Sequence, residues 1–136
     1  MNYTDDLRGI IQNRERKKQI LDYSGLKYGQ CTPSDVDGLL EYHDTCIILY
    51  EYKYDSAPTP HGQRQALERL CNAIEHGGKP CLILVCQHDV QDCGQDVDAA
   101  AAIVRELYTG GRWYTGGKRT SRECTDAFIK KFGGDA

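Results

Sequence analysis

The sequence lacks any long apolar run, whereas a transmembrane helix needs about 20 consecutive apolar residues. No segment of the 136 residues approaches that length, so no membrane-spanning helix is expected. The sequence also lacks a surplus of positive charge, since its formal net charge is −3, which gives no support to a strongly basic nucleic-acid-binding coat. Nucleic acid is not excluded, because the local potential decides and a bound cation supplies its own positive charge. Internal repeats and low-complexity segments are absent as well.

The cysteine patterns of common metal and redox sites are also missing. Seven cysteines are present, yet no two form a Cys-x-x-Cys pair, and no Cys or His pair has the spacing usual for structural zinc. The chain does not open with a charged and then apolar leader, and the cysteine count is odd, which argues against a secreted disulfide framework. We therefore expect reduced cysteines and a cytoplasmic protein.

Length and composition set the remaining bounds. A chain of 136 residues is long enough for one hydrophobic core and leaves little room for a second. Charged residues make up 27% and hydrophobic residues 40% of the chain, which is ordinary for a globular protein and argues against disorder. A single domain over residues 1–136 is the expectation.

The run at residues 46–54 is the strongest strand signal of the chain. It reads Cys-Ile-Ile-Leu-Tyr-Glu-Tyr-Lys-Tyr, which is rich in the β-branched and aromatic residues that favour strands. Because side chains alternate between the two faces of a strand, Glu51 and Lys53 share a face with Ile47 and Leu49. The opposite face is also largely apolar, so the strand is expected inside a sheet covered on both sides. Glu51 and Lys53 mark either a functional site or an exposed ion pair where the strand meets solvent.

A second strand is predicted at residues 33–42, joined by a tight turn to the strand described above. The alternation of side chains within it places Asp35 and Asp37 on one face. In the resulting hairpin, this acidic pair lies beside Glu51 and Lys53 of the neighbouring strand. An acid followed along the chain by Glu-x-Lys is the spacing on which the functional prediction depends.

At these residues the sequence resembles the PD-(D/E)xK nucleases, the restriction-endonuclease-like superfamily. The resemblance combines a proline, an acid beside a glycine, a hydrophobic strand ending in Glu-x-Lys, and a glutamine that opens the next helix: Pro33, Asp35 or Asp37, Gly38, residues 47–50, Glu51, Lys53 and Gln63. Pro33 adjoins Ser34 and not the acid, so Asp35 and Asp37 both stay candidates for the aspartate of the family. Gly38 favours Asp37, because a glycine lets a nucleic-acid backbone or a partner strand approach closely.

The resemblance implies an α/β fold with an αβββαβ core, in which helices flank a mixed central sheet. It implies that Asp37 and Glu51, with the main-chain carbonyl of Tyr52, bind one or two Mg²⁺ ions, with Mn²⁺ as an alternative; these hard cations prefer oxygen ligands. Lys53 would orient the attacking water or help to deprotonate it, which makes it a catalytic candidate. Gln63 would support a phosphate or a bound water.

The function implied by the resemblance is metal-dependent hydrolysis of phosphodiester bonds. DNA is the favoured substrate, with RNA as the alternative, and small members of the superfamily occur among phage and prophage genes. Compact nucleases of this fold often dimerise, so a homodimer is expected. Two alternatives stay open: a catalytically inactive nucleic-acid-binding or regulatory module on the same fold, and a small α/β scaffold that binds a protein partner.

The other elements follow from hydrophobic periodicity and from helix-capping signals. Helices are predicted at residues 5–23 and 63–76, from an Asp96 or Asp98 cap through Leu107, and from a Thr120 cap to Phe132; further strands are predicted at residues 26–31, 81–86 and 110–114, and a turn at residues 43–45. The strand at residues 81–86 follows a helical crossover and should run parallel to its predecessor.

Two further residues are candidates for the site. Glu15 lies in the first predicted helix, from which some branches of the superfamily supply an additional acid to the metal; the alternative is a solvated surface residue. The positive end of the helix at residues 63–76 would attract a phosphate, with Gln63 and Arg64 at hand.

Overall fold

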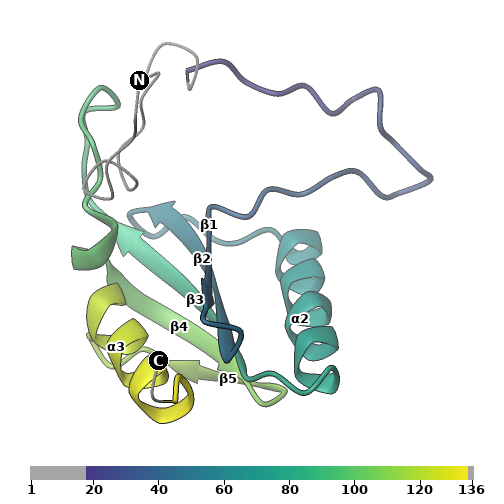
Figure 1. Cartoon of the computed structure of the whole chain (residues 1–136). Helices are drawn as coiled ribbons and strands as arrows, with labels where there is room; N and C mark the ends of the chain where they lie inside the picture. The colour runs from purple at the N-terminus through teal and green to yellow at the C-terminus, as the bar shows by residue number, and fades with distance from the viewer. Residues whose placement is uncertain (1–17, 135–136) are drawn as a thin grey trace, which may run out of the picture. The chain divides into compact units, whose positions relative to one another are not determined.

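The computed structural model describes residues 18–134 (Figure 1). The chain divides into two units, Met1–Pro33 and Ser34–Ala136. Within the described residues, no helix combines the length and the apolar character that crossing a membrane requires.

In the described part of the first unit, residues 18–33, the backbone forms turns. The predicted helix is wrong for residues 18–23, which are not helical; the Asp22 side chain accepts a hydrogen bond from the Ser24 amide at 2.9 Å, a local bond that competes with helix formation. The predicted strand at residues 26–31 is reduced to one isolated bridge between Tyr28 and Cys31. The remainder of the predicted helix, with Glu15, lies outside the described residues.

The second unit contains a five-stranded sheet with the strand order β1-β2-β3-β4-β5. The strands are β1 (Gly38–Tyr42), β2 (Cys46–Tyr54), β3 (Cys81–His88), β4 (Ile103–Thr109) and β5 (Arg112–Thr115). Neighbouring strands are antiparallel except β2 and β3, which run parallel. The sheet is therefore mixed, and the prediction that the strand at residues 81–86 runs parallel to its predecessor is confirmed.

Strand β2 lies inside the sheet, as its sequence predicts, between β1 and β3. Its side chains alternate between two separate hydrophobic clusters: Ile47 and Leu49 belong to one, and Cys46 and Ile48 to the other. The parallel connection from β2 to β3 passes through helix α2 (His61–His76). The predicted face of Glu51 and Lys53 is therefore the face that α2 covers.

The first strand is shorter than predicted, because β1 begins at Gly38 and residues 33–37 are not part of the sheet. A side chain takes the place of the strand at this end: the Asp37 carboxylate, at Oδ2, accepts the Tyr52 amide at 2.8 Å, the bond that a neighbouring strand would otherwise make. Gly38 lies opposite Tyr50, whose Cβ would be 3.3 Å from a Cβ added at Gly38, so the glycine makes room for the tyrosine.

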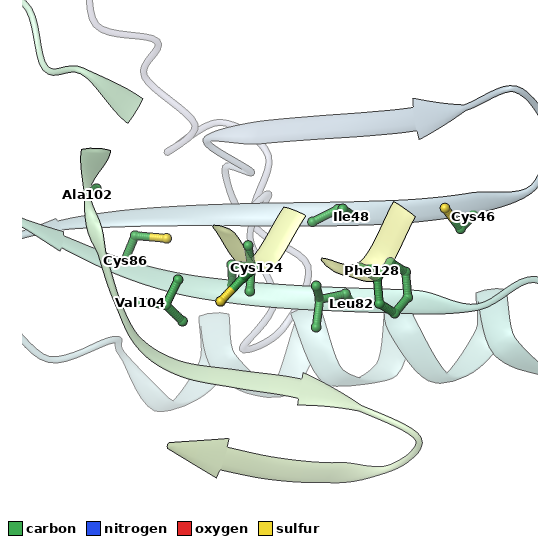
Figure 2. Close-up of a cluster of buried hydrophobic side chains, with 9 residues drawn as sticks. Cys46, Ile48, Leu82, Cys86, Ala102, Val104, Cys124 and Phe128 are labelled. Carbon is green, nitrogen blue, oxygen red and sulfur yellow. The ribbon is translucent and has the colours of Figure 1, made fainter. Parts of the chain in front are cut away.

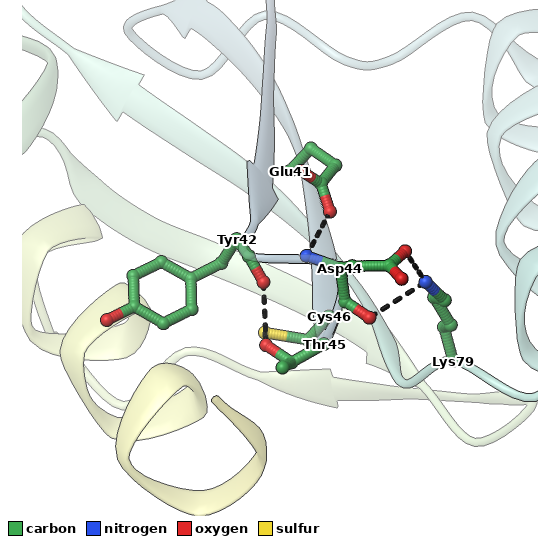
Figure 3. A network of polar contacts seen from close by, with 6 residues as sticks. All are labelled: Glu41, Tyr42, Asp44, Thr45, Cys46 and Lys79. Atoms are coloured by element: carbon green, nitrogen blue, oxygen red, sulfur yellow. Dashed lines mark hydrogen bonds and ion pairs between the residues drawn. The ribbon is translucent and has the colours of Figure 1, made fainter. Parts of the chain in front are cut away.

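The predicted turn between β1 and β2 is confirmed, and Figure 3 shows its polar contacts. His43 and Asp44 both have positive φ, 47° and 62°, which matches the right-handed twist of a hairpin. Glu41 accepts the Asp44 amide at 2.7 Å, and Lys79, just before β3, donates to the carbonyl and the carboxylate of Asp44. The start of β3 is thereby attached to the turn of the hairpin.

The helix predicted from an Asp96 or Asp98 cap through Leu107 is wrong. Asp98 does cap a helical turn, with its carboxylate accepting the Ala100 amide at 3.1 Å, but only the short 3₁₀ helix η2 (Ala99–Ala101) follows. The chain then continues as β4, because β-branched Ile103 and Val104 favour a strand and β4 pairs with β3 on one side and β5 on the other. The helix preference of the preceding alanines is too weak to prevent this strand pairing.

Helix α2 covers one face of the sheet, and helix α3 (Ser121–Phe132) covers the other (Figure 1). The predicted capping box of α3 is present, formed by Thr120 and Glu123. Between α3 and the sheet lie the buried side chains of Cys46, Ile48, Leu82, Leu84, Cys86, Ala102, Val104, Cys124 and Phe128, most of which are labelled in Figure 2. The predicted mixed α/β architecture with flanking helices is confirmed; in the described residues two strands precede α2.

Candidate active site

The packing of strand β2 against helix α2 brings Glu51 and Gln63 together. On β2, Glu51 follows Leu49 on the face that α2 covers. On α2, Gln63 lies one turn before Leu67 and two turns before Cys71, the two buried residues of the helix. Residues spaced by four share a helix face, so the packing of Leu67 and Cys71 on the sheet also directs Gln63 toward Glu51.

Glu51, Lys53 and Gln63 form a closed triangle of polar contacts. Gln63 Nε2 donates to Glu51 Oε1 at 3.0 Å, and Lys53 Nζ donates to Gln63 Oε1 at 3.2 Å. The third side is the ion pair between Lys53 Nζ and Glu51 Oε1, also at 3.2 Å. The Glu51 side chain is only 3% exposed and that of Lys53 18%, so the alternative of an exposed ion pair at a strand end is wrong.

Asp37 lies beside this triangle, at the edge where β1 begins. Its Oδ2 accepts the amide of Tyr52, and its charge is close enough to raise the pKa of Glu51. The amide and the carbonyl of one residue point to the same edge of a strand, so the carbonyl of Tyr52 points toward Asp37 as well. Asp37 and the carbonyl of Tyr52 therefore lie on the β1 side of β2, and Asp37 is close to the carboxyl of Glu51.

Asp35 contributes its main chain and not its carboxylate. Gln63 Nε2 donates to the Asp35 carbonyl oxygen at 3.3 Å. Between the two candidate aspartates, Asp37 is thus the one whose carboxylate lies next to Glu51.

Glu51 is held in an environment that disfavours its charge. Burial raises the pKa of the Glu51 carboxyl above its ordinary value, the charge of Asp37 adds to the rise, and Lys53 opposes it. Oxygen Oε2 of Glu51 is buried and has no hydrogen-bond partner among the described residues. A buried carboxylate oxygen without a partner is costly, and a cation at this position would remove that cost.

The donor set fits a hard divalent cation. Two carboxylates and a carbonyl supply oxygen ligands, and Mg²⁺ typically takes one or two carboxylates and completes its shell with water and phosphate. No cluster of three or more His, Cys, Asp or Glu side chains suited to a metal occurs within residues 18–134. A metal at this site would therefore depend on Asp37, Glu51 and the carbonyl of Tyr52.

Beside Gln63, α2 makes contacts with β4 and β5 that the sequence did not indicate. Arg64 lies over the Trp113 ring, with its guanidinium carbon 3.8 Å from the ring centroid, and forms an ion pair with Glu106. Glu68 accepts from the Trp113 indole at 2.5 Å. The i, i+4 spacing of Arg64 and Glu68 was the only signal in the sequence. Arg64 thus connects α2 to β4 and β5 through Glu106 and Trp113. It does not point toward a phosphate beside Gln63, contrary to the prediction from the sequence.

The raised pKa of Glu51 predicts how stability depends on pH. Between the ordinary value of 4.5 and the raised value in the folded state, the folded protein binds more protons than the unfolded chain, so wild-type stability falls as pH rises. Glu51→Gln removes this loss. In buffer with EDTA, the free energy of unfolding of the variant minus that of the wild type should therefore increase from about pH 4.5 upward, as measured by urea denaturation.

Glu123→Gln is the contrasting control for this measurement. The Thr120 amide and hydroxyl lower the pKa of the Glu123 carboxyl, so this residue stabilises the folded state above its folded pKa and loses the effect as pH falls below 4.5. For Glu123→Gln, the free energy of unfolding of the variant minus that of the wild type should become more negative as pH rises toward 4.5. A flat or falling difference for Glu51→Gln would contradict the assigned environment of Glu51.

Comparison of this chain with models of protein families, with curated proteins and with solved structures gave no match.

Proposed function

We propose that this protein is a metal-dependent nuclease with a restriction-endonuclease-like arrangement, in which the β1–β2 hairpin, α2 and the parallel strand β3 form the core of the site. The observation that carries the proposal is the buried Glu51, with one oxygen held by Lys53 and Gln63 and the other without a partner beside Asp37. If the ion pair of Glu51 and Lys53 were purely structural, the carboxylate of Asp37 would only weaken it, because two negative charges at close range repel each other.

Each residue of the site has a role in this proposal. Asp37, Glu51 and the carbonyl of Tyr52 would hold Mg²⁺, or Mn²⁺ in its place, and the ion would stabilise negative charge that develops on the phosphate. Lys53 Nζ orients the attacking water or takes part in its deprotonation. Gln63 forms hydrogen bonds with both Glu51 and Lys53. It holds these two side chains in position and binds a phosphate oxygen.

The reaction is hydrolysis of a phosphodiester. The oxygen of water forms a bond to phosphorus, the bond from phosphorus to the leaving sugar oxygen breaks, and no oxidant or reductant is needed. One proton leaves the water and one is taken up by the leaving oxygen, so the protons balance. The positive charge of Lys53 lowers the energy of the transition state, in which charge on the phosphate is largest.

The test is incubation of the purified protein with linear duplex DNA, single-stranded DNA, branched DNA and RNA, each with Mg²⁺, Mn²⁺ or EDTA. Cleavage of at least one substrate with a divalent cation and none with EDTA is expected, with DNA preferred. Binding of DNA without cleavage under any condition would favour an inactive nucleic-acid-binding module instead. Neither binding nor cleavage would favour a scaffold for a protein partner. The homodimer stays a prediction, which light scattering with and without DNA tests.

A further inference from the structure

An open pocket of about 620 Å³ lies between α3 and the hairpin formed by β4 and β5. Its floor is apolar and includes Leu82, Leu107 and Phe128, which belong to the cluster under α3. Tyr114 on β5 and Phe132 on α3 also line the pocket, and 46% and 37% of their surfaces are exposed. Volumes of about 300 to 1,000 Å³ with an apolar lining and a few polar groups are typical of sites for small molecules.

The charged residues around the pocket are mostly basic. Arg119 and Lys131 form no ion pair among the described residues: the Arg119 Nε donates to the Gly116 carbonyl, and the Lys131 ammonium lies 5.2 Å from the Phe132 ring centroid. The acid in the lining, Glu75, already accepts the Gly110 amide at 3.1 Å. The pocket therefore combines an apolar floor with two cations that form no ion pair among the described residues, although the charge of Arg119 does act on the nearby Glu123 carboxyl.

This pocket is separate from the candidate active site. The cluster that forms its floor lies on the α3 face of the sheet, whereas Glu51 and Lys53 lie on the α2 face. Along the strands it lies near the start of β3, since Lys79 and Pro80 line it, whereas Glu51 is paired with Val85 farther along. A molecule in this pocket would not touch the residues proposed for cleavage.

We propose that the pocket binds a small amphipathic anion, with an alkyl or aryl body against the apolar floor and one anionic head group at Arg119 and Lys131. Apolar area removed from water supplies the larger part of the affinity. The head group gains charge-assisted hydrogen bonds, which are shorter and stronger than neutral ones. A cationic head group would meet the positive charges of Arg119 and Lys131 and is disfavoured.

The test compares two probes with alkyl chains of nearly equal length and opposite charge: dodecanoate and dodecyltrimethylammonium, titrated calorimetrically below their micellar concentrations. Dodecanoate should bind about tenfold or more tightly than the cation, since only the anion gains hydrogen bonds to the charged groups of Arg119 and Lys131. Lys131→Glu should remove this preference. Lys130→Glu is the matched control, because it makes the same charge change on the neighbouring residue of α3, outside the pocket lining, and should bind dodecanoate like the wild type.

Ala127→Trp provides a second variant, since Ala127 lines the pocket from an exposed position on α3. The larger side chain should fill the space and abolish dodecanoate binding while circular dichroism stays unchanged. Equal affinity for both probes, no binding of dodecanoate, or equal losses in Lys131→Glu and Lys130→Glu would overturn the proposal. So would a wild-type dimer in light scattering that Ala127→Trp dissociates, because the pocket would then hold a second copy.

Discussion

Lys53→Ala should lower metal-dependent cleavage by about 10² to 10⁴-fold, the range over which a positioned group of this kind contributes to a rate. Lys53 Nζ lies 3.2 Å from Glu51 Oε1 and 3.2 Å from Gln63 Oε1. In the proposed mechanism its removal takes away a positive charge beside the phosphate and no metal ligand. The variant should fold and retain most of its affinity for Mn²⁺, which calorimetry measures. Initial rates at saturating Mg²⁺ give the activity.

Two variants sharpen this result. Lys53→Arg should rescue poorly, because a guanidinium is planar, has a different shape and does not give up a proton. Lys130→Ala removes a lysine from the exposed surface of α3 and should cleave like the wild type. Wild-type rates in Lys53→Ala would remove Lys53 from the catalytic assignment.

Asp37→Asn should abolish cleavage with Mg²⁺ while leaving the melting temperature of the metal-free protein unchanged or raised. An asparagine oxygen can still accept the Tyr52 amide, the contact that Asp37 makes at 2.8 Å. The substitution also removes the carboxylate whose charge raises the pKa of Glu51, so repulsion within the metal-free site decreases. Cleavage assays and thermal denaturation in EDTA, run on the same preparation, measure both effects.

Asp35→Asn is the matched comparison, because it makes the same chemical change two residues away. Asp35 contacts Gln63 through its main-chain carbonyl, and that contact does not depend on the side chain. Activity should therefore fall only partially. An inactive Asp35→Asn together with a fully active Asp37→Asn would require the metal site to be rebuilt around Asp35.

The parts of the fold that the sequence predicted correctly are those with strong local signals. Strand β2 and its face parity follow from the alternation of residues 46–54, and β3 follows from an uninterrupted apolar run that is buried in the structure. The capping box at Thr120 marks the start of α3. In each case the local preference and the packing agree, which is the situation in which sequence patterns are reliable.

The error at residues 103–107 occurs where tertiary pairing decides the outcome. The alanine run before Ile103 favours a helix, but pairing with β3 and β5 makes the following segment a strand. Pairing with β3 also includes a register shift next to Val85 that leaves Arg105 as an extra residue in β4. Such a bulge breaks the alternation of side chains and has no signature in the sequence.

In the candidate site, too, the local features could be predicted from the sequence and the tertiary contacts could not. Glu51 and Lys53 share a face because side chains alternate along a strand, and this alternation can be predicted from the sequence alone. Their contacts with Gln63, and the position of Asp37 at the Tyr52 amide, depend on how α2 and β1 pack against β2. The motif resemblance brought these residues together as a hypothesis; the carbonyl of Asp35 and the attachment of α2 through Arg64 had no counterpart in the sequence.

The most direct measurement of the central claim is cleavage by the wild type and by Glu51→Gln, purified in parallel and assayed on the same DNA with Mg²⁺ and with EDTA. Glu51→Gln keeps the size of the buried side chain and removes the charge that a metal needs, so the variant folds and a contaminating nuclease would appear equally in both preparations. The account predicts products from the wild type with Mg²⁺ alone and none from Glu51→Gln. Equal cleavage by the two proteins, or equal rates with Mg²⁺ and with EDTA, would contradict it.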